Sequence, residues 1–186
     1  IDSIWVILRQ CELERNQNYT LKYLNHQNKI DPEKEIHNPN LYAIWNLKSY
    51  ISYKIAEENP FGSNFFIYTD SGAWRRKILP NWPDQKFISE ELLPTIKNRI
   101  LFGQIAKFDE FDETNDIIEG TFFAGSYTAT RDFYNNFFAI HDERLNNNLF
   151  IGKDQTIMNL LAFKNFKDSV VILEIFKYTC IKYDVW

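Results

Sequence analysis

Four consecutive large apolar or aromatic residues, Phe65 to Tyr68, constrain the fold of this chain more than any other stretch. Such a run predicts a strand that is buried on both faces, as in a parallel sheet. The strand continues to Thr69 and ends in Asp70-Ser71-Gly72. Open α/β sheets bind ligands at the carboxyl ends of their strands, so Asp70 is a candidate binding residue. Gly72 lets a ligand approach the backbone closely, although the same residues also suit an ordinary turn.

The rest of the chain alternates between predicted strands and helices, which favours an α/β fold with a mixed, mostly parallel sheet. We expect residues 9–40 to be irregular, with at most one helical turn, and residues 71–88 and 109–116 to form loops. The 186 residues suit a single domain spanning positions 1–186. The predicted strands cover residues 4–8, 65–69, 100–105, 117–124 and 169–176. The predicted helices cover residues 41–58, 128–145 and 153–163.

The charge and the cysteine content argue against several classes of function. A formal charge of −4 gives no electrostatic reason to expect nucleic acid or an anionic membrane as partner. No apolar run reaches the roughly 20 residues that span a bilayer. Cys11 and Cys180 have no C-x-x-C spacing, which argues against a zinc knuckle and leaves one disulfide possible. The chain enters a predicted strand directly at its start, so we expect a fragment, with a cytoplasmic or membrane-peripheral location favoured.

Two glycines bracket a short aromatic strand in the stretch Glu119 to Ser126. Gly120 and Gly125 suggest that the backbone passes close to something bulky, such as a bound ligand. A strand flanked by two turns explains the same pattern equally well.

A further candidate lies at the predicted start of the helix 153–163. Asp154 and Gln155 follow Gly152, so their side chains can project from the helix mouth into a cleft. An aspartate there can act as a general base or hold an acceptor hydroxyl. It can equally be an acid that complements the helix dipole. Arg75, with Arg76, could bond a diphosphate, or be a solvated surface residue.

Four blocks of this sequence resemble the bacterial HtrL/YibB-like family. Together they cover about residues 40–165, and their order and spacing also fit the family. The blocks are Tyr42-Ala43-Ile44-Trp45-Asn46-Leu47-Lys48 with Asn59-Pro60-Phe61, then Phe65 through Arg75, then Gly120 to Gly125, and Ile151-Gly152-Lys153-Asp154-Gln155.

The resemblance implies a glycosyltransferase-like protein of the GT-A kind, acting in surface polysaccharide or lipopolysaccharide synthesis. It implies that strands normally precede the point where this chain begins. It also implies a nucleotide-sugar donor, a glycan or lipid-linked acceptor, and a divalent cation (Mn²⁺ or Mg²⁺) held by Asp70 against the diphosphate. This sequence has Asp70-Ser71-Gly72 where many such transferases carry D-x-D, and the missing second aspartate puts metal binding in doubt.

We therefore expect a GT-A-like domain that transfers a sugar from a nucleotide donor. Asp70, Gly72, Arg75, Gly120 and Gly125 would form the donor and acceptor cleft. Asp154 would be the base and Gln155 a hydroxyl ligand. We also predict that Asp70, Gly125 and Asp154 converge on one cleft.

Two alternatives remain open on the sequence alone. The first is a non-catalytic carbohydrate-binding or scaffold protein on the same fold, because a fold does not fix a function. The second is a nuclease or phosphatase that uses scattered carboxylates, which ranks last because no close pair of acids follows a predicted strand.

Overall fold

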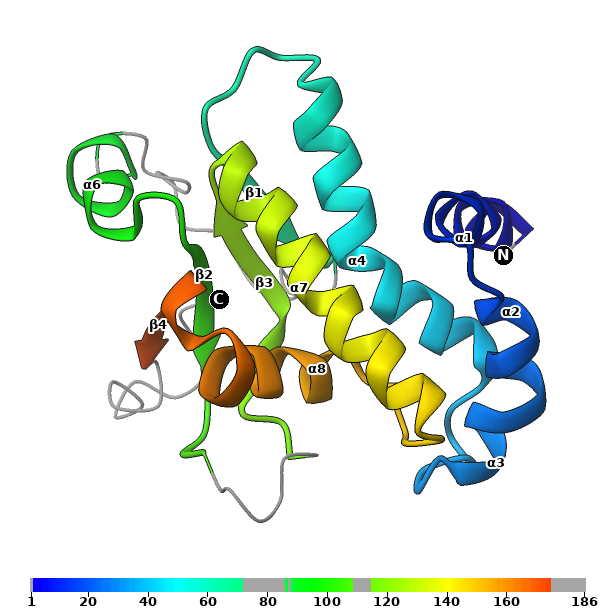
Figure 1. The fold of residues 1–186 in the computed structure, drawn as a ribbon. Coiled ribbons are helices and arrows are strands. Elements are labelled where there is room, and N and C mark those ends of the chain that lie inside the picture. Colours follow the sequence, from blue (N-terminus) through cyan, green and yellow to red (C-terminus); the bar gives the residue numbers. More distant parts are fainter. Residues whose placement is uncertain (1, 72–85, 87, 109–114, 175–186) are drawn as a thin grey trace.

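The computed structural model describes residues 2–71, 86, 88–108 and 115–174, and it packs helices on a four-stranded sheet (Figure 1). The strands are β1 (Phe66–Thr69), β2 (Ile100–Gln104), β3 (Ile118–Gly125) and β4 (Val170–Glu174). The longer helices are α1 (Asp2–Arg15), α4 (Pro39–Glu58), α7 (Tyr127–Asn146) and α8 (Asp154–Leu160). The shorter helical segments are α2 (Tyr19–Lys22), η1 (Tyr23–Gln27), α3 (Asn28–Ile30), η3 (Ile88–Leu92), α6 (Leu93–Ile96), η4 (Leu161–Asn165) and η5 (Lys167–Ser169).

The helix α4 illustrates how local sequence sets these boundaries. Asn38 precedes it, and the Asn38 side chain accepts a hydrogen bond from the Asn40 amide, while Pro39 occupies the first turn. Proline suits that position because its missing N–H would have no partner there. The helix ends at Asn59, whose φ of 41° is left-handed, a conformation that asparagine tolerates. The predicted helix 41–58 is confirmed.

The predicted strands at 65–69, 100–105 and 117–124 are confirmed, and so is the described part of the strand predicted at 169–176; the four lie in one sheet, in the order β1-β3-β2-β4. The prediction that this sheet is mostly parallel is wrong. β3 pairs antiparallel with both β1 and β2, and the β2–β4 pair alone is parallel. The Ile105 amide donates to the Ile117 carbonyl at 2.8 Å, so the chain returns beside itself after β2. Such a return joins antiparallel strands, whereas parallel strands need a crossover.

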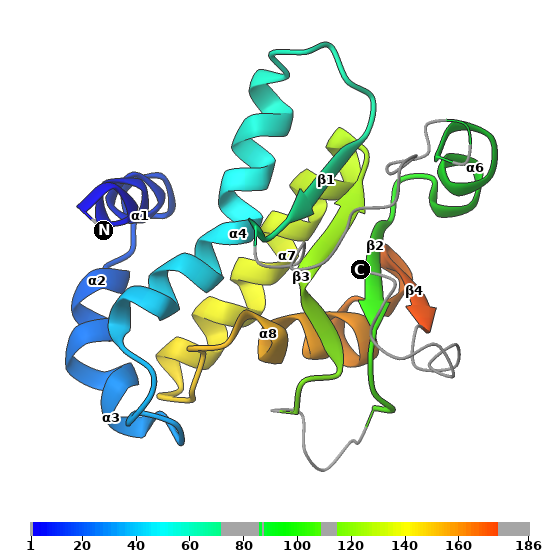
Figure 2. The same ribbon diagram turned by 180° about the vertical axis from the view of Figure 1, so that it is seen from behind.

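Both faces of β2 are nevertheless buried, which explains why this strand resembled one of a parallel sheet. The prediction that residues 65–68 are buried on both faces is wrong, because β1 lies at the edge of the sheet and is only half-buried along its length. Side chains alternate between the faces: Phe102 belongs to the large core under α4, α7 and α8, and Leu101 belongs to a smaller core with Ile96 of α6. Figure 1 shows α4, α7 and α8 on the near face, and Figure 2 shows β1 at the edge of the sheet seen from behind. A buried two-sided strand therefore does not require a parallel sheet.

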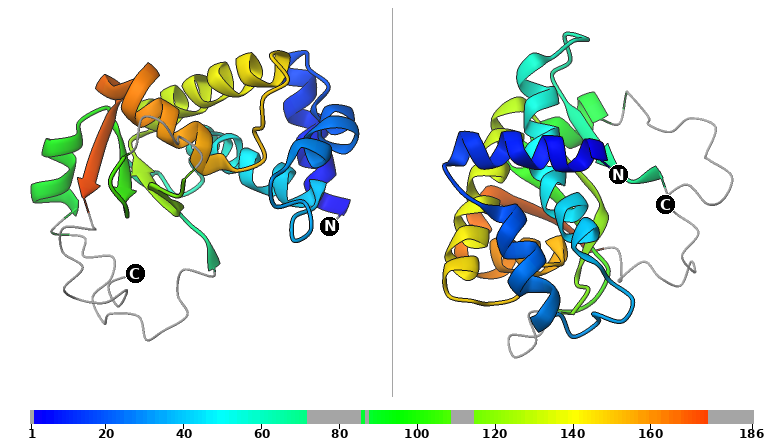
Figure 3. Two further views of the ribbon diagram at one scale, coloured as in Figure 1. Left: turned by 90° about the horizontal axis from the view of Figure 1, so that it is seen from below. Right: turned by 90° about the vertical axis from the view of Figure 1, so that its right-hand side faces the viewer.

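The strand predicted at residues 4–8 is wrong, because these residues belong to α1. Leu8 and Cys11 are fully buried, while Val6 and Leu13 are 69% and 77% exposed. Burial at positions three apart is the helical pattern, and a five-residue apolar run is too short to show it. The region 9–40, expected to be irregular, is mostly helical as well. Figure 3 shows these N-terminal helices together at the end of the molecule away from β4.

Most of the predicted loops 71–88 and 109–116 lie outside the described residues. Among the helices that the structure does describe, none combines the length and the apolar character needed to cross a membrane.

Candidate functional site

A lysine brings together two of the carboxylates that the sequence singles out. The Lys48 ammonium lies 3.2 Å from Asp70 Oδ2 and 2.9 Å from Asp154 Oδ2. It also donates a hydrogen bond of 2.8 Å to the carbonyl of Gly120. Asp70 and Asp154, although far apart in the sequence, thus share a single cation, as the predicted convergence of these two residues requires.

Four elements position this cluster. Lys48 projects from α4, Asp70 follows the last residue of β1, Gly120 lies in β3, and Asp154 is the first residue of α8. The Asp70 amide donates to the carbonyl of Thr121 at 3.0 Å. That bond continues the β1–β3 ladder by one residue and fixes the backbone of Asp70.

The two carboxylates differ in exposure. The Asp154 side chain is 5% exposed and that of Lys48 is 7% exposed, whereas 31% of the Asp70 side chain faces solvent. Asp70 Oδ1 accepts a hydrogen bond from the Tyr68 hydroxyl. Asp70 is therefore the member of the cluster that a solute can reach.

The charges of the cluster follow from burial and from these contacts. Burial alone would lower the pKa of Lys48, but Asp154 and then Asp70 outweigh it and hold that pKa above its ordinary value. Burial raises the pKa of Asp154, and the ammonium at 2.9 Å opposes that rise. Burial and the bond to Asp70 raise the pKa of Tyr68, so its hydroxyl remains a donor. We treat Lys48 as charged, because it faces two carboxylates.

Gln155 and Gly120 also lie at the cluster, in contact with each other. Gln155 Nε2 donates a 2.9 Å hydrogen bond to the Ile118 carbonyl of β3. A Cβ atom on Gly120 would stand 3.0 Å from Cγ of Gln155, so the glycine makes room for this side chain. In the structure Gln155 holds α8 against β3.

Gly125 lies elsewhere, and the expectation that it joins Asp70 and Asp154 is wrong. It pairs with Phe66, at the start of β1, whereas Asp70 follows the end of that strand. Because β1 and β3 are antiparallel, Gly125 lies beside the first residue of β1, and Gly120 lies near Asp70 beyond the last residue of β1. A Cβ atom on Gly125 would stand 2.8 Å from Cβ of Ala129, so this glycine permits close packing against α7. Gly72 and Arg75 lie outside the described residues.

The described residues do not fit a divalent cation at Asp70. Within residues 2–71, 86, 88–108 and 115–174, no group of three histidine, cysteine, aspartate or glutamate side chains could hold a metal ion. One oxygen of Asp70 bonds Lys48 and the other accepts the Tyr68 hydroxyl. The ammonium therefore takes the place between the two carboxylates where a metal ion would lie.

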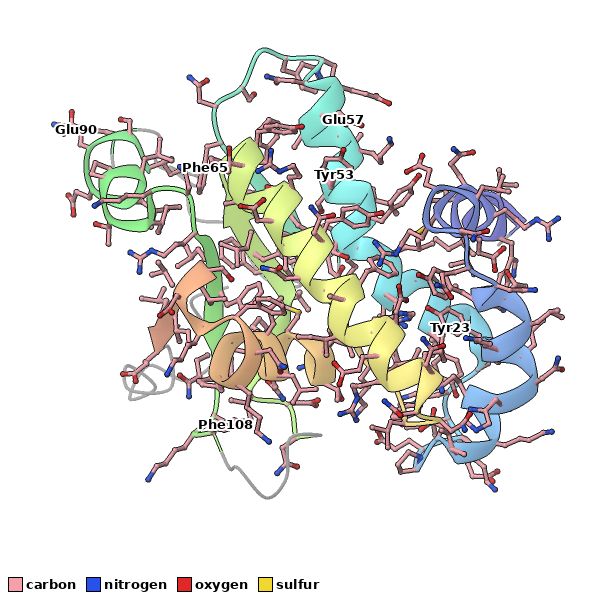
Figure 4. All side chains as sticks on the ribbon, viewed as in Figure 1. Tyr23, Tyr53, Glu57, Phe65, Glu90 and Phe108 are labelled. Carbon is pink, nitrogen blue, oxygen red and sulfur yellow. The ribbon has the colours of Figure 1, made fainter. Side chains whose placement is uncertain are left out.

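A cavity of about 280 Å³ shares Tyr68 with the surroundings of Asp70, but Lys48, Asp70, Gly120 and Asp154 do not line it. It lies between α4, β1 and α7, and Tyr68 lines it together with Ile51, Ile55, Phe66 and Thr130. A wider hollow of about 410 Å³, lined by Asn59, Asn98 and Ser126 among others, lies toward the Gly125 end of β3. Figure 4 labels Tyr53 and Glu57 along this part of α4, with Phe65 on the neighbouring strand segment.

Lys48 was not among the residues that the sequence singled out for a role. It lies three positions after Trp45 and three before Ile51, within the predicted apolar stripe of the helix 41–58. A lysine inside such a stripe must either reach solvent or find a buried partner. The place of Lys48 in this apolar stripe was therefore the sequence feature that could have predicted a buried ion pair.

No family model, no curated protein and no solved structure matches this chain.

Proposed function

We propose that this chain is a glycosyltransferase that moves a sugar from a nucleotide-sugar donor to a hydroxyl of a saccharide or lipid-linked acceptor. The observation that supports it best is the meeting of Asp70 and Asp154 on Lys48 at the carboxyl end of β1. Asp70 is the partly exposed member of this cluster, so a ligand at this end of β1 would meet its carboxylate. A partly exposed carboxylate at such a place can accept a hydrogen bond from a sugar hydroxyl and then its proton.

In this proposal Asp70 is the general base. The oxygen of the acceptor hydroxyl forms a bond to the anomeric carbon of the donor, and the bond from that carbon to the diphosphate breaks. The hydroxyl proton passes to the Asp70 carboxylate, and the electron pair of the broken bond leaves with the nucleoside diphosphate. Asp154 is too buried to meet an acceptor, so it acts by holding Lys48 in place. No step is assigned to a metal ion.

The substitution Asp70→Asn tests this role. The amide would keep the size of the side chain and lose the proton acceptor, so transfer should fall by about 10²–10⁴. Because Asp70 is partly exposed, the free energy of unfolding should change by only about 1 kcal/mol. The measurement is the initial transfer rate and the melting midpoint of one preparation, assayed with a panel of nucleotide sugars.

Asp132→Asn is the matched control, because Asp132 is a 43% exposed aspartate on α7 that pairs with Arg131. It should keep both the rate and the midpoint. A fully active Asp70→Asn variant would remove Asp70 from the mechanism.

The second candidate is a non-catalytic carbohydrate-binding or scaffold protein. It is favoured because the polar groups of the cluster already have partners within the protein. Three oxygens lie 2.8, 2.9 and 3.2 Å from the Lys48 ammonium, and the Gln155 amide donates to the Ile118 carbonyl of β3. Saturable binding of a saccharide, without turnover of any nucleotide sugar, would decide for this candidate.

A further inference from the structure

The surroundings of the Lys48 ammonium are those of a bound cation. Three oxygens from three different elements lie 2.8–3.2 Å from Nζ, namely one from each of Asp70 and Asp154 and the carbonyl of Gly120. The Tyr68 ring adds its face, with its centroid 5.7 Å from Nζ, and such a face attracts a positive charge. A lysine ammonium is a compact point charge that can replace a small cation in this role.

The charges of the cluster also argue against a metal ion between the two carboxylates. The buried Asp154 carboxylate lies 2.9 Å from Nζ and the partly exposed Asp70 carboxylate lies 3.2 Å from it, so one ammonium serves both carboxylates. A divalent ion that bridged Asp70 and Asp154 would have to displace Nζ from between them. The displaced ammonium would then be a buried charge without its partners, which is costly.

We propose that Lys48 is the resident cation of this site, so that the protein neither needs nor binds a divalent metal ion between Asp70 and Asp154. The inference deepens the proposed function and rests on it for its catalytic consequence: transfer should proceed in a metal chelator. Lys48 is then a positioning residue, because it fixes the carboxylate of Asp70 and does not itself touch the substrate.

The structural part of the inference can be tested without any activity, by titrating Mn²⁺ into the whole chain and into Lys48→Met. The wild-type protein should show no Mn²⁺ binding at this site with a Kd tighter than about 1 mM. Lys48→Met keeps the length of the side chain and leaves the two carboxylates facing each other with no counter-charge. It should bind Mn²⁺ at least about tenfold more tightly, a gain equal to about 1.4 kcal/mol.

Adding Asp70→Asn to Lys48→Met should abolish this gain. A Lys48→Met protein that folds and binds Mn²⁺ no better than the wild type would overturn the inference. Tight Mn²⁺ binding by the wild type that disappears in Asp70→Asn would overturn it equally.

The wild-type protein alone decides the question if Lys48→Met does not fold. Paramagnetic Mn²⁺ broadens the NMR signals of nearby nuclei, so a substoichiometric amount should leave the backbone amide signals of Tyr68 and Asp70 sharp. Selective broadening centred on Asp70 would contradict the inference.

The catalytic part has its own measurement. The initial transfer rate should be the same in excess EDTA and in added Mn²⁺, and a rate that EDTA abolishes and Mn²⁺ restores would overturn the inference. If no nucleotide sugar is turned over under any condition, the proposed transferase function fails, and the Mn²⁺ titration still decides whether Lys48 is the resident cation.

Discussion

At the scale of single residues, the two glycines of β3 show how one sequence signal serves two purposes. Gly120 lies at the Lys48 cluster and makes room for Gln155, whereas Gly125 makes room for the first turn of α7. The sequence places both at the ends of an aromatic strand and cannot distinguish them. The distinction comes from the antiparallel pairing of β1 and β3, which only the three-dimensional structure reveals.

The two glycines should therefore respond differently to a methyl group. In Gly125→Ala the new Cβ would stand 2.8 Å from Cβ of Ala129 and 3.2 Å from Cδ1 of Ile100, in a packed core. Overpacking of this kind costs typically about 1–3 kcal/mol. Chemical unfolding should show that loss, with donor or saccharide binding unchanged.

Gly120→Ala should behave in the opposite way. Its neighbour is the side chain of Gln155, with Cγ at 3.0 Å and Cδ at 3.2 Å, which can shift at the expense of its bond to Ile118. We expect a loss of less than about 1 kcal/mol in stability and a clear loss of ligand binding. Equal effects of the two substitutions on ligand binding would contradict this assignment.

At the scale of elements, periodicity decides how much could be predicted from the sequence. The helix 41–58 and the strands 65–69 and 117–124 have apolar residues in long or clearly bounded patterns, and their type is confirmed. The run from Ile4 to Leu8 was misleading, because five apolar residues suit a buried strand as well as one side of a helix. Strand direction was not predictable, because Ile96 of α6 packs on the second face of β2 and β3 at Leu101 and Ala124, so these central strands are as apolar as those of a parallel sheet.

The same element scale explains how the end of α1 is tied to α7. Arg15, in the last turn of α1, bonds Asp142 of α7 at 2.8 Å and lies 4.7 Å from the centroid of the Phe138 ring. Its Nε also donates to the Tyr19 hydroxyl at 3.0 Å. This pairing could not be predicted from a short sequence motif, because Arg15 and Asp142 are 127 positions apart.

Replacing Arg15 by methionine should loosen α1 from the rest of the chain. The variant keeps most of the apolar stem and leaves Asp142 without its guanidinium partner. For a pair that is 17–18% exposed, we expect a loss of about 2–3 kcal/mol, below the range for fully buried pairs. Hydrogen exchange should become faster in α1 and in α2, while the strands β2 and β3 keep their protection.

At the scale of the whole molecule, a buried chain of hydrogen bonds connects the N-terminal helices to α7. The Tyr23 hydroxyl lies 2.7 Å from Nε2 of His141, and Nδ1 of His141 lies 2.9 Å from Oδ1 of Asp142. An ionised Asp142 only accepts, so His141 donates from Nδ1, and Nε2 accepts from Tyr23. Figure 4 shows Tyr23 on the N-terminal side of the molecule, beside the lower part of α7. In this arrangement the imidazole is neutral, and burial keeps it so by lowering the pKa of His141.

The burial of His141 predicts that acid weakens the whole fold well above the pH at which carboxylates titrate. Burial, only partly opposed by Asp142, lowers the pKa of His141 below its ordinary 6.5. The unfolded chain therefore binds this proton first, and stability is complete above about pH 6.5 and falls as the pH drops below it. Protonation of Nε2 would also reverse the bond to Tyr23, because Nε2–H would then donate to the Tyr23 hydroxyl oxygen. Each kcal/mol lost should lower the melting midpoint by about 2–4 °C.

The melting midpoint measured from pH 8 to pH 5 checks this prediction, with one variant and one control. His141→Gln removes the titrating group, so its midpoint should start lower and depend less on pH between 6.5 and 5. His26→Gln, which changes a partly buried histidine outside this chain of hydrogen bonds, should keep the wild-type slope. If His141→Gln instead retains the full acid dependence, the loss arises elsewhere, and the Tyr23–His141–Asp142 connection is not what makes the N-terminal helices sensitive to acid.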